Sequence, residues 1–214
     1  MTLALPLVLL LQSGLLATPP MTSVNGPVQE LNSPDNGQRI TVSVLEEDEV
    51  RSAFSVLAER QDIPYAAWDG SYARAHKMVR ILEDKDITAA KAWVVGALYV
   101  DSKLFGEMGL SYHVAPLVFV RVGRATTPYV LDPSLFDKPV PYEAWKAKLL
   151  AKPKAKLERA YFTTRFAYDP DDRTAALSSY SEESVQDMNQ TNRNLLRALF
   201  MYERGLQIKG SKQP

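Results

Sequence analysis

Residues 69–78 read DGSYARAHKM, and this stretch decides the fold that the sequence predicts. Gly70 closes a loop, and residues 71–83 then combine helix-forming side chains with apolar residues at helical spacing. Ser71 is therefore expected in the first turn of a helix. Backbone N–H groups in such a turn have no partner within the helix, and together with the helix dipole they stabilise negative charge. Position 71 thus suits a nucleophile.

A nucleophile needs a base, and the chain has two histidines. His76 follows Ser71 by five residues, which places it about 140° further around the helix, so we expect a structural role for it. His113 lies at the start of an apolar run, and Asp132 ends the next one. If these two strands are neighbours, Asp132 can orient His113 as in a Cys–His–Asp-type triad. Spacing alone leaves open that His113 is structural and Asp132 a turn residue.

The rest of the chain alternates between helical and strand-like patterns. Helices are predicted over residues 46–60, 71–83, 142–150 and from 179–182 to about 205, and strands over residues 92–100, 112–122, 128–131 and 161–168. Pro116 falls inside the second strand, which predicts a bulge or a sheet edge there. This order indicates one α+β domain with a papain- or transglutaminase-like core, in which the nucleophile-bearing helix packs on an antiparallel sheet.

Composition changes along the chain suggest the domain boundaries. Residues 1–18 contain an apolar run that is too short to span a membrane and typical of a secretory signal peptide. We therefore expect an exported protein, periplasmic or secreted, without a stable membrane anchor; a misassigned start or a buried apolar segment is the alternative. Residues 19–42 are rich in Pro, Ser, Asn and Gly and are predicted to be a flexible linker. Residues 43–208 form the expected domain, and residues 209–214 a tail.

Charge and composition exclude several classes of function. The chain has 25 basic and 25 acidic side chains, so no overall field favours nucleic acid as a partner. It has no cysteine, which excludes disulfides and thiolate metal sites. With its two histidines far apart in sequence, we expect neither a metal site nor a cofactor. We expect a monomer.

Three segments resemble the bacterial protein glutaminases, which are protein-glutamine deamidases. Residues 69–78 resemble the active-site segment of that family, whose third residue is the catalytic Cys. Residues 111–115 (SYHVA) and 131–136 (LDPSLF) follow in the same order, and they carry the residues that match the family's His and Asp. The resemblance covers about residues 45–137 and is weak beyond them.

The resemblance implies hydrolysis of the side-chain amide of glutamine in a protein or peptide, giving glutamate and ammonia. In family terms, the residue at position 71 attacks the carboxamide, His113 transfers protons and Asp132 orients His113, and no cofactor takes part. Trp68 and Tyr72 lie on either side of position 71 in the sequence. We expect one of them to contact the substrate, with burial as the alternative.

This chain departs from the family pattern at the nucleophile, where Ser71 replaces Cys, and Pro116 interrupts the strand that carries His113. A serine lacks the preformed thiolate, so the replacement predicts weak or no activity. Three hypotheses follow: a deamidase scaffold that is inactive or weak because of Ser71, a homologue that lost its chemistry and binds proteins or peptides, and a serine-dependent amidase.

Overall fold

The computed structural model describes residues 26–66, 69–102 and 104–210. The predicted signal peptide and Trp68 lie outside these residues. The strands are β1 (Val28–Asn32), β2 (Arg39–Leu45), β3 (Ala90–Ser102), β4 (Gly106–Val122), β5 (Ala125–Val130), β6 (Val140–Pro141) and β7 (Lys156–Thr163). The helices are α1 (Glu47–Ala58), α2 (Ser71–Glu83), α3 (Tyr142–Leu149) and α4 (Glu182–Gly210), and Pro170–Thr174 forms a short 3-10 helix.

The strands form a single sheet in the order β1-β2-β4-β3-β7, with β5 paired to β4 and β6 paired to β5. The pairs are antiparallel apart from β2 and β4, whose short parallel contact matches Val44 with Phe119 and Leu45 with Val120. This arrangement confirms the predicted α+β class with a mostly antiparallel sheet.

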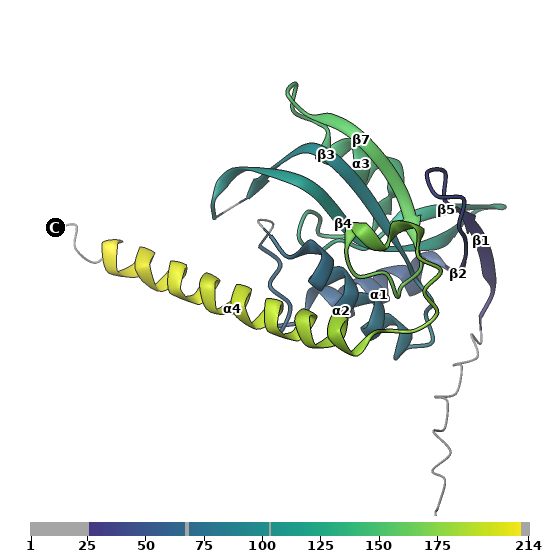
Figure 1. Ribbon diagram of the computed structural model, residues 1–214, viewed down its shortest axis with the longest axis horizontal. Coiled ribbons are helices and arrows are strands. Elements are labelled where there is room, and N and C mark those ends of the chain that lie inside the picture. The colour runs from purple at the N-terminus through teal and green to yellow at the C-terminus, as the bar shows by residue number, and fades with distance from the viewer. Residues whose placement is uncertain (1–25, 67–68, 103, 211–214) are drawn as a thin grey trace, which may run out of the picture.

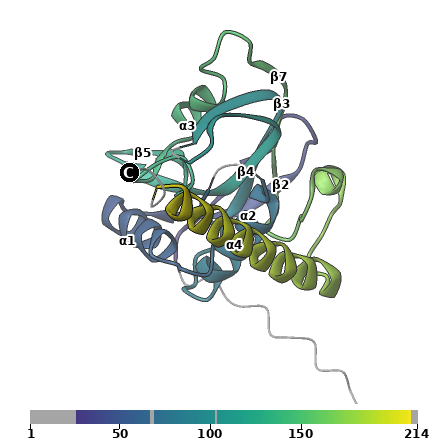
Figure 2. The same cartoon turned by 90° about the vertical axis from the view of Figure 1, so that its left-hand side faces the viewer.

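Helix α2 lies between the sheet and α4, and it packs on both (Figure 1). Its core-facing stripe is apolar, as the helical spacing predicts, because Met78, Val79 and Leu82 are all buried. Figure 2 shows α4 crossing in front of α2, and in Figure 1 the C-terminal half of α4 extends past the body of the molecule. The helix that carries Ser71 is thus covered on two sides.

Strand β4 runs without interruption through Pro116, contrary to our expectation that this proline interrupts the strand. Pro116 pairs with Lys91 of β3, and its carbonyl accepts a 2.9 Å hydrogen bond from Leu131 N. The pairing with β5 begins one residue later, where Leu117 faces Val130. The missing N–H of Pro116 therefore falls where β5 has just ended, so β4 keeps its course without a bulge at this position.

The prediction of a flexible linker over residues 19–42 is wrong from Val28 onward, because β1 and the first four residues of β2 lie there. Leu31, Ile40 and Val42 are buried in the core, and this burial stabilises two strands in a segment rich in turn-forming residues. The predicted strand over residues 161–168 starts five residues earlier than expected and ends at Thr163.

Candidate functional site

Ser71 is the first residue of α2, and the backbone before it is unusual. Gly70 has φ 71° and ψ 22°, a left-handed conformation that costs glycine little. The first backbone bond of the helix joins Arg74 N to Gly70 O at 3.0 Å. The three N–H groups of residues 71–73 therefore have no partner within the helix. These N–H groups are hydrogen-bond donors next to Ser71. Ser71 itself is mostly buried, with 7% of the residue exposed.

Helix α4 packs closely against the turn that contains Gly70. A methyl group added at Gly70 would lie 2.3 Å from Leu195 Cδ1 and 3.5 Å from Thr191 Cγ2. Leu195 is buried, so the two elements are in tight contact. Gly70 is thus needed both for its backbone conformation and for the close approach of α4.

His113 on β4 and Asp132, two residues after β5 ends, are neighbours in the sheet region. His113 Nε2 lies 2.8 Å from Asp132 Oδ2, and both side chains are almost fully buried. Because Nε2 of His113 is taken up by this bond, Nδ1 is the ring nitrogen that can bond another group. The expectation that the two residues lie side by side on adjoining strands matches this geometry.

Asp132 accepts hydrogen bonds from three directions. Trp145 Nε1 on α3 donates to Asp132 Oδ2 at 2.8 Å, and the backbone N–H and the hydroxyl of Ser134 donate to Oδ1. Burial alone would raise the pKa of Asp132, but the charge of His113 and the bonds from His113, Ser134 and Trp145 outweigh it, so the pKa falls to about 2. Asp132 is therefore an ionised acceptor held in one orientation.

Ser71 and His113 line one cavity of about 220 Å³. The first turn of α2 forms one wall and residues 109–113 of β4 form the other. Among the described residues, no hydrogen bond joins Ser71 to His113. The cavity is smaller than the 300–1,000 Å³ typical of pockets that enclose a whole ligand, so it suits a single side chain.

Arg74 also lines this cavity, although sequence reasoning gave it no role. The residue is 2% exposed, and burial lowers the pKa of its guanidinium, while the charges of Asp132 and Asp69 oppose this. Its Nη1 donates to the carbonyl of Asp69, and Gly70 N donates to the Asp69 carboxylate at 2.6 Å. Arg74 thus ties the loop before Ser71 to the helix.

His76 lies apart from this cavity, as its position on the helix predicts. It is fully buried, with Nδ1 2.8 Å from Lys91 Nζ and Nε2 3.3 Å from Ser184 Oγ. Burial, then the charges of Lys91 and Arg80, lower the pKa of His76 to about 2. Burial also lowers the pKa of Lys91 well below its usual value. These buried polar groups connect α2, β3 and the start of α4.

The two residues expected to contact substrate have different outcomes. Tyr72 packs edge-on against Tyr168, with ring centroids 5.2 Å apart, and it does not line the cavity with Ser71. Trp68 lies outside the described residues. A substrate contact by either residue stays a prediction.

Within residues 26–66, 69–102 and 104–210, the structure shows no group of three or more His, Cys, Asp or Glu placed to hold a metal ion. No helix in the described part of the chain is long and apolar enough to cross a membrane.

Comparison with known proteins identifies the domain. Residues 49–149 match a family model described as glutaminase. A crystal structure of protein-glutaminase is 26% identical with a TM-score of 0.60, over 70% of this chain and 86% of that one. A crystal structure of pro-protein-glutaminase is 25% identical with a TM-score of 0.61, over 72% of this chain and 58% of that one. No curated protein sequence matches the chain.

The NMR structure of protein-glutaminase from Chryseobacterium proteolyticum is 26% identical to this chain, with a TM-score of 0.56, and the match covers 68% of this chain and 85% of that one. The matched segment 49–149 contains Ser71, His113, Asp132 and Trp145. The resemblance stated from the sequence is therefore confirmed at the level of family and fold. Residues 49–149 thus resemble the glutaminase family, and the domain has the fold of the protein-glutaminases.

Proposed function

We propose that this chain is a protein-glutamine deamidase scaffold in which position 71 is the nucleophile position, His113 the base and Asp132 the residue that orients His113. The observation that carries the proposal is the buried 2.8 Å bond between His113 and Asp132 beside the cavity that His113 shares with Ser71. The substrate is then glutamine within a protein or peptide. The product is protein-bound glutamate, released together with ammonia.

With a thiol at position 71, the chemistry follows from the donors in the cavity. His113 Nδ1 takes the thiol proton, and the sulfur attacks the carbon of the carboxamide. The unpaired N–H groups at the start of α2 stabilise the negative oxygen of the tetrahedral intermediate. His113 returns the proton to the nitrogen, ammonia leaves, and a thioester remains. Water, deprotonated by His113, hydrolyses the thioester to glutamate and restores the thiol.

Ser71 changes the first of these steps. The start of a helix and a neighbouring imidazole stabilise a thiolate, but a hydroxyl stays protonated at neutral pH and depends entirely on its base. We therefore infer that the chain as it stands is inactive or weakly active. This inference makes the second hypothesis a real alternative, since a cavity without chemistry can still bind a glutamine side chain.

An ammonia-release assay on a glutamine-rich protein tests the proposal by comparing the chain as it stands with Ser71→Cys. We expect release from the Ser71→Cys form, and its loss when His113→Ala is added. If Ser71→Cys releases no ammonia but still binds glutamine peptides, the binding module is favoured. Labelling of Ser71 by a serine-directed phosphonate, lost in His113→Ala, would favour the serine-dependent amidase. We further propose export from a bacterial cell, on the strength of the apolar pattern of residues 1–18.

A further inference from the structure

A second, larger cavity of about 910 Å³ is lined in part by the residues that follow Asp132. Its walls come from three places: residues 65–66 before the Ser71 turn, residues 133–137 directly after Asp132, and Leu199 and Glu203 on α4. The end of the β3–β4 hairpin and Lys148 of α3 complete it. We call this cavity the α4 groove. In the sequence, its residues 65–66 come shortly before Ser71, and its residues 133–137 come directly after Asp132.

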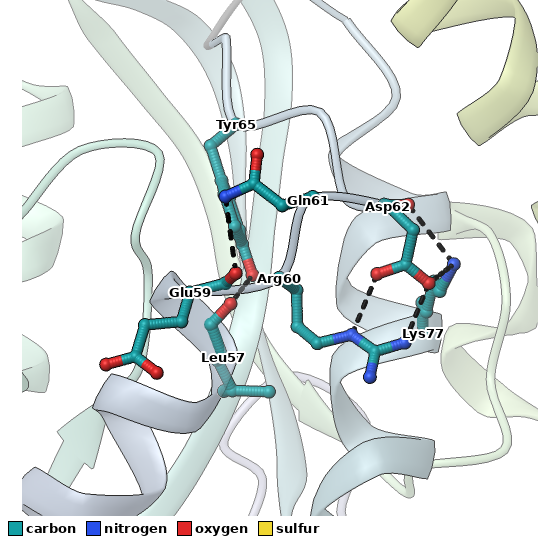
Figure 3. Close-up of polar contacts among 7 residues, drawn as sticks. All are labelled: Leu57, Glu59, Arg60, Gln61, Asp62, Tyr65 and Lys77. Carbon is teal, nitrogen blue, oxygen red and sulfur yellow. Dashed lines mark hydrogen bonds and ion pairs between the residues drawn. The ribbon is translucent and has the colours of Figure 1, made fainter.

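The first wall of the α4 groove is held in place by a network of polar contacts (Figure 3). The hydroxyl of Tyr65 donates to Leu57 O at 2.6 Å. In the same loop, Asp62 pairs with Arg60 at 2.7 Å and with Lys77 of α2 at 2.8 Å. The bond from Arg60 is the main reason that the pKa of Asp62 lies well below its usual value, with burial opposing it. The loop that presents Tyr65 to the groove is thus anchored to both α1 and α2.

The other two walls are anchored as well. Leu135 N and Phe136 N both donate to the carbonyl of Asp132, at 3.2 and 3.1 Å, so the loop that lines the groove is fixed to the residue that holds His113. On α4, the hydroxyl of Tyr202 donates to Leu104 O at 2.9 Å and its ring packs on Phe105, with centroids 4.7 Å apart. A groove whose walls are fixed before binding loses little entropy when it takes up a ligand.

The groove lining combines apolar side chains with acidic ones. Tyr65, Leu104, Leu135, Phe136 and Leu199 supply the apolar surface. Its charged lining residues are three acidic ones, Asp101, Asp137 and Glu203, and one basic one, Lys148. Asp101 is already paired with Lys152 at 2.9 Å, whereas Asp137 and Glu203 have no ion pair within the described residues. The lining therefore favours a ligand with both apolar and cationic side chains.

We propose that the α4 groove binds the polypeptide next to the reacting glutamine, and that it selects segments with an apolar and a basic side chain. This inference rests on the proposed function, because the 220 Å³ cavity admits the glutamine side chain while its main chain and neighbours must lie outside. Residues 65–66 and 133–137 of the groove lie within a few residues of Asp69 and Asp132 in the chain, so the groove is close to the candidate site, and its volume falls in the range of sites that bind a ligand. Helix α4 is then a specificity element.

Peptide binding to the chain as it stands tests the proposal without any need for activity. The probes are two fluorescein-labelled peptides with one central glutamine and one leucine, identical except that one has two lysines beside the glutamine and the other has two glutamates. We expect the lysine peptide to bind more tightly in fluorescence anisotropy. Glu203→Lys and Asp137→Lys should each weaken its binding by roughly threefold, and together by about tenfold. The difference should shrink in high salt.

Glu183→Lys is the matched control, because it makes the same change on α4 at an exposed residue outside the groove. Equal binding of the two peptides, or an equal loss of binding in Glu183→Lys, would overturn the proposal. Concentration-dependent dimerisation that Glu203→Lys abolishes would overturn it too, since a second copy of the chain would then fill the groove. Thermal denaturation checks that the variants fold.

The same peptides separate the groove from the proposed function. In Ser71→Cys, the groove variants should raise KM for ammonia release from the lysine peptide and leave kcat unchanged. No ammonia from any peptide, with the binding preference intact, would refute the deamidase and leave the groove standing. Ammonia release at equal rates from both peptides would support the deamidase and refute the groove.

Discussion

The indole Nε1 of Trp145 donates a 2.8 Å hydrogen bond to Asp132 Oδ2, the oxygen that also accepts from His113 Nε2. The indole ring also packs beside the His113 imidazole, with centroids 5.8 Å apart. Trp145 is completely buried. It therefore fixes the carboxylate that fixes the imidazole, and we regard it as a positioning residue.

Trp145→Phe should lower kcat of the Ser71→Cys form at least about tenfold and leave KM unchanged, because a lost hydrogen bond to a charged group costs about 1.5–3 kcal/mol. Trp93→Phe is the matched control, since Trp93 is equally buried and its Nε1 bonds Thr163 Oγ1 instead. Both variants should have a lower free energy of unfolding, but only Trp145→Phe should have a lower kcat. Equal losses of kcat would show that Trp145 acts through stability alone.

Ser71→Cys introduces the only thiol of a chain that has no cysteine, so its alkylation can be followed directly by mass spectrometry. The start of α2 and His113 should stabilise the thiolate, and we expect iodoacetamide to react well below pH 8.5, the usual pKa of a free thiol being about 8.5. Adding His113→Ala should move the reaction to higher pH. Ser111→Cys, on the opposite wall of the same cavity, serves as the control with ordinary reactivity. Identical pH profiles for the two thiols would refute activation at position 71.

Gly70→Ala should destabilise the protein more than Gly37→Ala, although both residues have φ close to 70°. A methyl group at Gly37 meets no atom within 4 Å, so it costs only the conformational energy, about 1–2 kcal/mol. At Gly70 it also collides with Leu195. Urea denaturation of Gly70→Ala, Leu195→Ala and the double variant should give a favourable coupling energy. Additive effects would mean that α4 does not press on this turn.

Stability should fall as the pH drops below about 6.5, the pKa of an unperturbed histidine. The pKa of His76 is about 2 in the folded protein, so between these values the unfolded chain binds a proton that the folded one does not, and folding is disfavoured. Lys91 also lowers stability as the pH falls, but its contribution begins below its ordinary pKa of 10.5, because its pKa in the folded protein is lowered too. Asp132 adds to the loss only below its ordinary pKa of 3.8.

His76→Asn removes the titrating ring, so its urea midpoint should depend less on pH between pH 6 and pH 4 than that of the parent chain. The slopes of the free energy of unfolding against pH should differ by about 1.4 kcal/mol per pH unit at most, the value for one proton. A parent and a variant with the same slope would show that the acid sensitivity arises elsewhere.

The sequence was sufficient where local chemistry decides the structure. Gly70 and the apolar spacing after it predict the start of α2 at Ser71, and the turn after β5 puts Asp132 beside His113. These features depend on neighbours in the sequence or on adjacent strands. The family resemblance covers the same stretch, and it is the source of the roles proposed for positions 71, 113 and 132.

The remaining features depend on contacts between distant segments, and no local pattern predicts them. Trp145 has the spacing of an ordinary core residue of α3, and its bond to Asp132 depends on how α3 packs. Lys91 lies in a strand and is buried only because His76 and the Ala167 carbonyl accept its hydrogen bonds. Strand β1 has one buried side chain, Leu31, so its alternation is too weak to distinguish it from a linker.

The burial of Lys91 also provides an internal probe of unfolding. Its side-chain amine is completely buried and its pKa is lowered as well, whereas the lysines at the surface are open to reagents. Amine acylation of the native protein should therefore spare Lys91, and a peptide map that shows acylation there would mark molecules that had opened fully. Pulse labelling at this one site would count such molecules without any engineered tag or dye.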